Sequence, residues 1–210
     1  MKVYETNEIK NIALIGSKGS GKTTLAEAML YECGVIKRRG TIDAGNTVCD
    51  YFPVEKEYGY SVFSTVCYAE FLNKKLNVID CPGGDDFVGN AITALNVTDT
   101  GVLLIDAQYG VEVGTQNIFR TTEKVKKPVI FALNQLDGEK VDFDNVVTQM
   151  KEVFGPKVVL VQYPINPGTG FNAMIDVLLM KMYSWGPDGG VPTISEIPAE
   201  ERDQIGRAHV

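Results

Sequence analysis

Short apolar runs alternate with amphipathic segments along most of the chain. Three runs are almost wholly apolar, as in strands buried on both faces of a parallel sheet: 9–15, 101–106 and 128–133. Apolar residues at helical spacing fall between them in 87–95, and segments 113–125 and 143–154 also suit helices. The alternation predicts an α/β fold with a doubly wound, mostly parallel sheet.

Further elements complete this pattern. Segment 24–33 predicts a helix that ends at Gly34, and two β-rich runs, 61–71 and 76–79, predict a hairpin. Residues 158–161 predict one more short strand. Residues 35–60 follow neither period, and a loop of this length in a compact domain is typical of a functional or a disordered segment.

The character of the chain changes after Tyr163, where prolines and glycines interrupt the alternation. Apolar residues at helical spacing within 171–179 predict a helix with a packing face. We therefore expect one main domain over 1–163 and the start of a second subdomain over 164–204. We expect residues 205–210 to be a non-native tail, because their codons would match a common sequencing adapter; they hold His209, the single histidine.

Composition narrows the class of protein. The chain has 210 residues, of which 44% are hydrophobic, and a formal net charge of -7, which argues against a nucleic-acid grip on this domain. Its four cysteines form no Cys-x-x-Cys pair, so neither a zinc site nor a disulfide framework is expected. The sequence shows no signal peptide and no apolar run of 18 residues. We expect a cytoplasmic protein that does not span a membrane.

The first chemical motif is a glycine-rich loop between a predicted strand and a predicted helix. It reads Gly16-Ser17-Lys18-Gly19-Ser20-Gly21-Lys22-Thr23, followed by Thr24, and fits the phosphate-binding P-loop pattern. Glycines let successive backbone N–H groups face one anion, and the helix that follows adds its positive end. Lys22 is expected to reach the β- and γ-phosphates, and Thr23 to offer its hydroxyl to Mg²⁺.

Two more motifs stand at the ends of later predicted strands. In Asp80-x-x-Gly83 the acid suits Mg²⁺, and the glycine N–H suits a γ-phosphate, so the next loop would sense that phosphate. In Asn134-Gln135-x-Asp137 the last carboxylate suits the N1–H and amino group of guanine, a donor pair that adenine lacks. All three motifs would share the sheet edge where such folds bind ligands.

The three motifs resemble those of translational GTPases, specifically the "type two" branch of the elongation factor G family. The likeness is carried by 12–24, 80–89 and 110–115, and it extends over about 10–203. It implies the GTP-binding domain of a multidomain ribosomal factor that uses GTP, GDP and Mg²⁺, with ribosomal RNA contacted mainly through other domains. It also implies that the family's last base-contacting loop, its final strand and helix, and later domains follow residue 210.

The sequence departs from the family pattern at several positions. Gly84 stands where the family has the histidine said to position the attacking water. Gly19 replaces a P-loop aspartate, Gln135 replaces a lysine, and Tyr58-Gly59-Tyr60-Ser61 replaces Arg-Gly-Ile-Thr. Ser61 keeps a hydroxyl, so the resemblance implies Thr23, Ser61 and Asp80 as Mg²⁺ residues.

These departures leave three hypotheses. The first is an active ribosome-stimulated GTPase. Asp85 or Asp86 could orient the water in it, although the resemblance implies that Asp86 is the family's ordinary switch-region acid. The second is a GTP-binding ribosomal factor with weak or no hydrolysis, because removal of one well-placed catalytic group costs about 3 kcal/mol or more. The third is a ribosome protection factor of the tetracycline-resistance type. We favour the second, with no catalytic residue assigned.

Overall fold

The computed structural model describes residues 2–187 and 189–202, so the expected tail at 205–210 lies outside the described residues. The chain forms two compact units. The first comprises Met1–Asp106 and Glu112–Asn134, and the second comprises Ala107–Val111 and Gln135–Val210.

The first unit is built on a five-stranded sheet of order β2-β3-β1-β4-β5. Its strands are β1 (Ile9–Gly16), β2 (Thr65–Phe71), β3 (Lys74–Asp80), β4 (Thr100–Asp106) and β5 (Val129–Asn134). β1 is parallel to β3 and β4, β4 is parallel to β5, and only the edge strand β2 is antiparallel. The prediction of a mostly parallel α/β sheet is confirmed.

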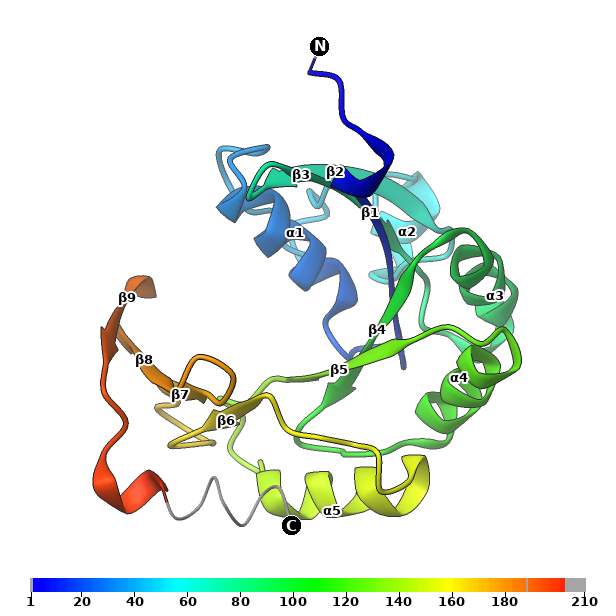
Figure 1. Ribbon diagram of the computed structural model, residues 1–210. Helices are drawn as coiled ribbons and strands as arrows, with labels where there is room; N and C mark the ends of the chain where they lie inside the picture. Colours follow the sequence, from blue (N-terminus) through cyan, green and yellow to red (C-terminus); the bar gives the residue numbers. More distant parts are fainter. Residues whose placement is uncertain (1, 188, 203–210) are drawn as a thin grey trace. The chain divides into compact units, whose positions relative to one another are not determined.

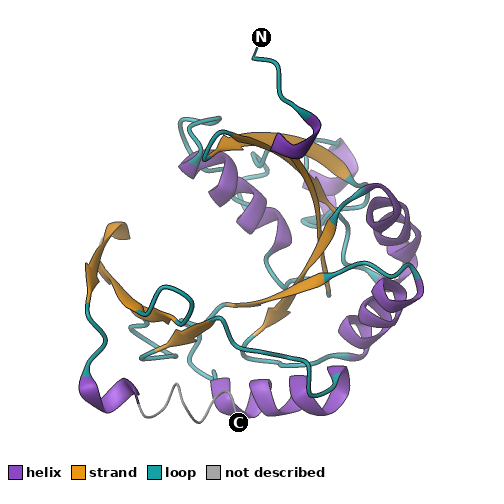
Figure 2. Ribbon diagram, in the orientation of Figure 1, coloured by secondary structure: helices purple, strands orange, loops and turns teal. Residues whose placement is uncertain are grey.

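Helices cover both faces of this sheet (Figures 1 and 2). On one face lies α1 (Lys22–Glu32), and on the other lie α3 (Val88–Val97) and α4 (Val113–Lys124). Successive residues of β1 serve opposite faces: Leu14 packs on the α1 side, whereas Ala13 and Ile15 pack on the α3 and α4 side. Because both faces are buried, β1 and β4 need the continuous apolar runs seen in the sequence.

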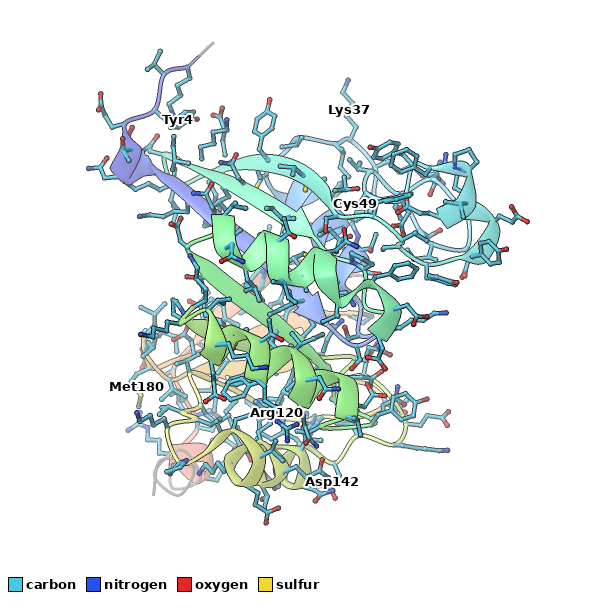
Figure 3. The ribbon with its side chains drawn as sticks, turned by 90° about the vertical axis from the view of Figure 1, so that its right-hand side faces the viewer. Tyr4, Lys37, Cys49, Arg120, Asp142 and Met180 are labelled. Carbon is cyan, nitrogen blue, oxygen red and sulfur yellow. The ribbon has the colours of Figure 1, made fainter. Side chains whose placement is uncertain are left out.

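The long loop over 35–60 is ordered around buried side chains. Glu27 of α1 accepts hydrogen bonds from the backbone N–H groups of Gly40 (2.8 Å) and Val48. Cys49, labelled in Figure 3, is buried in the core cluster on the α1 side, whereas Lys37 lies exposed. The loop also contains a short helix, α2 (Pro53–Tyr58), which the sequence pattern did not predict because six residues are too few to show a period.

The second unit holds α5 (Phe143–Phe154), as predicted, and a four-stranded antiparallel sheet. The sheet runs β6 (Gln162–Pro164), β7 (Ala173–Asp176), β8 (Lys181–Gly186) and β9 (Gly189–Ser195). Asp142 begins α5 by accepting a hydrogen bond from the Asn145 N–H at 3.1 Å. Ile175 and Ile197 form the buried centre of a small apolar cluster.

Two predictions fail in this unit. No strand forms over 158–161; the strand is β6, which pairs with β7 and begins at Gln162. The helix predicted within 171–179 is wrong as well. Ala173 and Ile175 are buried on one face of β7, so the relevant period is two, while Leu178 and Leu179 lie exposed in the following turn. Both turn N–H groups donate to Asp176 Oδ1 (2.9 and 2.8 Å), which stabilises the turn against a helix.

Candidate functional site

The glycine-rich loop connects β1 to α1 and takes backbone conformations that favour glycine. Gly21, directly before α1, has φ 92°, and a Cβ there would lie 2.2 Å from Asn134 Nδ2. Asn134 at the end of β5 donates from that same Nδ2 to the Ser20 carbonyl at 2.9 Å. The end of β5 therefore holds the loop in place, and a side chain at position 21 would separate them.

Lys22 is buried in the centre of the loop. Its ammonium donates to the carbonyls of Gly16 (2.9 Å) and Ser17 (2.8 Å) and lies 3.5 Å from Ser20 Oγ. Desolvation lowers the pKa of Lys22 to about 8, and the nearby charge of Asp80 opposes that shift. A buried cation at the N-terminus of a helix creates a strongly positive site, which suits a polyphosphate.

The three residues expected at a metal ion meet beside Lys22. Thr23 Oγ1 donates to Asp80 Oδ2 at 2.7 Å and lies 3.1 Å from Ser61 Oγ. Asp80 is 1% exposed at the end of β3, and burial raises its pKa to about 6. Thr23 comes from α1 and Ser61 from the loop before β2, so the hairpin and the P-loop converge here.

Asp50 is a site residue that sequence reasoning missed. It lies in the aperiodic loop, lines the same pocket as Lys22 and Thr23, and is 5% exposed. Both of its carboxylate oxygens, and Oδ1 of Asp80, are buried without a hydrogen-bond partner among the described residues. Burial raises the pKa of Asp50 as well. No motif surrounds Asp50, so only the fold of its loop could identify it.

These buried oxygens fit an oxygen-liganded divalent cation. Carboxylate and hydroxyl groups are the ligands that Mg²⁺ prefers, usually with water and phosphate oxygens completing the set. Within the described ranges, no three His, Cys, Asp or Glu side chains gather as a ligand set by themselves. A cation here would therefore depend on Thr23, Ser61 and the ligand's own oxygens.

Most of the remaining predicted residues of the first unit line the same pocket, and the others lie in or against the glycine-rich loop. Gly83 approaches the P-loop so closely that a Cβ on it would stand 2.4 Å from Lys22 Nζ and 2.7 Å from the Lys18 backbone nitrogen. Ser17 Oγ lies 3.0 Å from Thr115 Oγ1, which ties the P-loop to α4. The pocket lining consists of Lys18, Gly19, Gly21, Lys22, Thr23, Thr24, Ile42, Asp50, Gly59, Tyr60, Ser61, Gly83 and Gly84.

Gly84 differs from Gly83 in its surroundings. It has φ -76° and ψ 141°, a conformation open to any residue. A Cβ on Gly84 would meet only the Phe87 ring, at 3.2 and 3.6 Å. The position can thus accept a side chain at the cost of a small ring shift, and its glycine is not demanded by backbone geometry.

The predicted base-reading residues divide between the two units. Asn134 closes the first unit beside the P-loop. Gln135 and Asp137 belong to the second unit, where they form a turn closed by a hydrogen bond from the Gly138 N–H to the Gln135 carbonyl at 3.1 Å. The role of Asp137 in choosing guanine stays a prediction.

Comparison with known proteins finds elongation factors as relatives of this chain. The family model described as "Elongation factor Tu GTP binding domain" matches residues 7–198. An "Elongation factor G-like protein" from Thermotoga maritima is 37% identical over 180 residues, which are 86% of this chain and 26% of that protein. An "Elongation factor G 2" from Borreliella burgdorferi is 30% identical over 94% of this chain and 30% of its own length.

A solved structure has the same fold. A crystal structure of a protein from Thermus thermophilus superposes with a TM-score of 0.88 at 32% sequence identity, covering 96% of this chain and 30% of that one. The chain thus spans between a quarter and a third of the relatives it matches. No helix in the described ranges is both long and apolar enough to cross a bilayer.

Proposed function

Because this chain belongs to the elongation factor Tu GTP-binding domain family, we propose that it binds GTP with Mg²⁺ as part of an elongation factor G-like translation factor that acts on the ribosome. The observation that carries the proposal is that Lys22 and Thr23 line one pocket and that Asp80, at the end of β3, accepts a hydrogen bond from Thr23 Oγ1. Binding of a phosphate chain with its cation uses all three, and they come from two separate motifs.

Each group has a chemical role in this proposal. The N–H groups of the glycine-rich loop and the N-terminus of α1 bind the phosphates, and the Lys22 ammonium neutralises their charge. Thr23, Ser61 and Asp80 would hold Mg²⁺, and the buried Asp50 carboxylate would add negative charge beside it from the loop. When bound, Mg²⁺ would neutralise part of the phosphate charge. Asp137 selects guanine, with Asn134 supporting the loop.

We propose further that hydrolysis is weak. Gly84 has no side chain that can position water, and apart from its chain neighbours the nearest group to a Cβ built there is the Phe87 ring. Binding uses different residues, which are all present. The factor would then act by GTP occupancy on the ribosome in the cytoplasm, with the residues after 163 beginning an inserted subdomain of a longer protein.

The test is phosphate release from GTP by the full-length protein, with and without ribosomes, beside its Gly84→His variant. We expect the parent near background and the variant at least about 100-fold faster with ribosomes, the usual scale for one well-placed catalytic group. Lys22→Ala, which removes the phosphate cation, serves as the binding-defective control. Fast ribosome-stimulated turnover by the parent would show that another group, such as Asp85 or Asp86, positions the water.

A further inference from the structure

Two side chains from different loops meet at the mouth of the pocket. The Lys18 ammonium lies 3.6 Å from the centroid of the Tyr60 ring. Lys18 comes from the glycine-rich loop and is exposed, whereas Tyr60 comes from the loop before β2 and is half-buried. Both line the pocket that contains Lys22 and Gly83.

The Tyr60 ring, unlike a carboxylate, holds the Lys18 ammonium without neutralising its charge. An aromatic face attracts an ammonium through the ring quadrupole and leaves its full positive charge in place. A carboxylate partner would have neutralised that charge, but Lys18 makes no ion pair among the described residues. Tyr60 therefore restrains the ammonium while it remains available to an anion.

The position of the Lys18 backbone shows which part of the pocket its side chain can reach. The Lys18 backbone nitrogen and the Lys22 ammonium both approach within 2.7 Å of the point where a Cβ on Gly83 would stand. Gly83 is the residue whose N–H suits the terminal phosphate. Lys18 thus begins at the terminal-phosphate end of the pocket, and its flexible stem is long enough to reach an anion there.

We propose that Lys18 is a second phosphate-binding cation, selective for the terminal phosphate of a nucleoside triphosphate, and that Tyr60 positions it. The inference rests on the proposed nucleotide-binding function and adds a specificity residue to it. A diphosphate ends before this part of the pocket and gains little from Lys18. The triphosphate carries additional charge there and gains a charge-assisted hydrogen bond.

The decisive measurement is the ratio of two dissociation constants, for a non-hydrolysable GTP analogue and for GDP, by titration calorimetry with Mg²⁺. Lys18→Met should weaken analogue binding about tenfold, a typical value for one charged hydrogen bond, and change GDP binding less than about twofold. The matched control is Lys75→Met, because Lys75 also lies over a tyrosine, Tyr68, at 5.1 Å, but lines no part of the pocket. It should leave both constants unchanged.

Two variants of Tyr60 test whether its ring positions the Lys18 ammonium or only fills space. Tyr60→Phe keeps the aromatic face and should retain the analogue-to-GDP ratio, whereas Tyr60→Leu keeps bulk without the face and should lose about threefold in that ratio. A Lys18→Met variant that weakens both ligands equally, or neither, would overturn the inference. A parent chain that binds neither nucleotide would instead overturn the proposed function, so the two failures are distinguishable.

Discussion

Three buried ionisable residues at the site destabilise the ligand-free protein when they are charged, and a bound ligand can offset that destabilisation. Asp80 and Asp50 are buried acids whose pKa values burial raises, and Lys22 is a buried cation whose pKa burial lowers to about 8. All three shifts disfavour the charged forms that nucleotide and Mg²⁺ binding require. Without ligand these residues therefore reduce stability, and a bound cation and polyphosphate would restore it.

Asp80→Asn tests this cost through pH. The folded-state pKa of about 6 exceeds the model-peptide value of about 3.9, so the folded chain binds the proton more tightly. The contribution of Asp80 to stability is then present below about pH 4 and is lost as pH rises to about 6. In the absence of ligand, we expect Asp80→Asn to be more stable than the parent by about 3 kcal/mol at pH 7, but not at pH 4.

Urea unfolding of both proteins at pH 4, 5, 6 and 7 measures that difference, since other titrating groups cancel between them. A difference that stays constant across this range would refute the raised pKa of Asp80. The same variant should bind Mg²⁺-nucleotide far more weakly, because it removes the carboxylate that faces Thr23 Oγ1.

At the scale of elements, the site depends on how α1 begins against the end of β5. Gly21 combines a left-handed backbone with close approach to Asn134, while Gly34, just after α1, has φ 71° with nothing within 4 Å of a Cβ. The two glycines therefore carry the same kind of backbone requirement but differ in steric surroundings. Comparison of the two isolates the contact between elements.

Gly21→Ala should destabilise the chain by about 2–4 kcal/mol, through left-handed strain of about 1–2 kcal/mol and displacement of Asn134. Gly34→Ala should lower the free energy of unfolding only by the strain of the left-handed backbone. Adding Asn134→Ala to Gly21→Ala should recover the steric part, which a double-mutant cycle by chemical denaturation would measure. An equal loss of unfolding free energy at Gly21 and Gly34 would mean that the Asn134 side chain moves aside without an energetic penalty.

For the whole molecule, ligand binding should couple to stability because the pocket joins the P-loop, the 35–60 loop and the Asp80 loop. Saturation at about 100 times the dissociation constant adds about 2.7 kcal/mol, which for a chain of this size corresponds to roughly 5–11 °C in melting temperature. GDP with Mg²⁺ should produce this shift in a thermal melt of the parent. ADP should not, and a shift of equal size with ADP would argue against guanine selection.

The outcome of prediction differed between the two units for a physical reason. In the first unit, strands such as β1 and β4 are buried on both faces, so their apolar runs are unambiguous. In the second unit, short strands such as β7 have one buried face and few residues, and the apolar spacing in 171–179 matched a helix by chance. The strand predicted over 158–161 failed similarly, because pairing with β7 selects Gln162–Pro164.

The sequence by itself determined the α/β class, the glycine-rich loop and the acids at strand ends, because buried periodicity and phosphate chemistry are local requirements. Tertiary structure alone decided that Asp50 lines one pocket with Lys22 and Thr23 from an aperiodic loop, and that Lys18 meets Tyr60 across 42 positions of the chain (60 − 18). Such contacts depend on how loops close over a sheet edge. That closure is set by distant anchors, such as Glu27 bound to the N–H groups of Gly40 and Val48, and no local pattern records it.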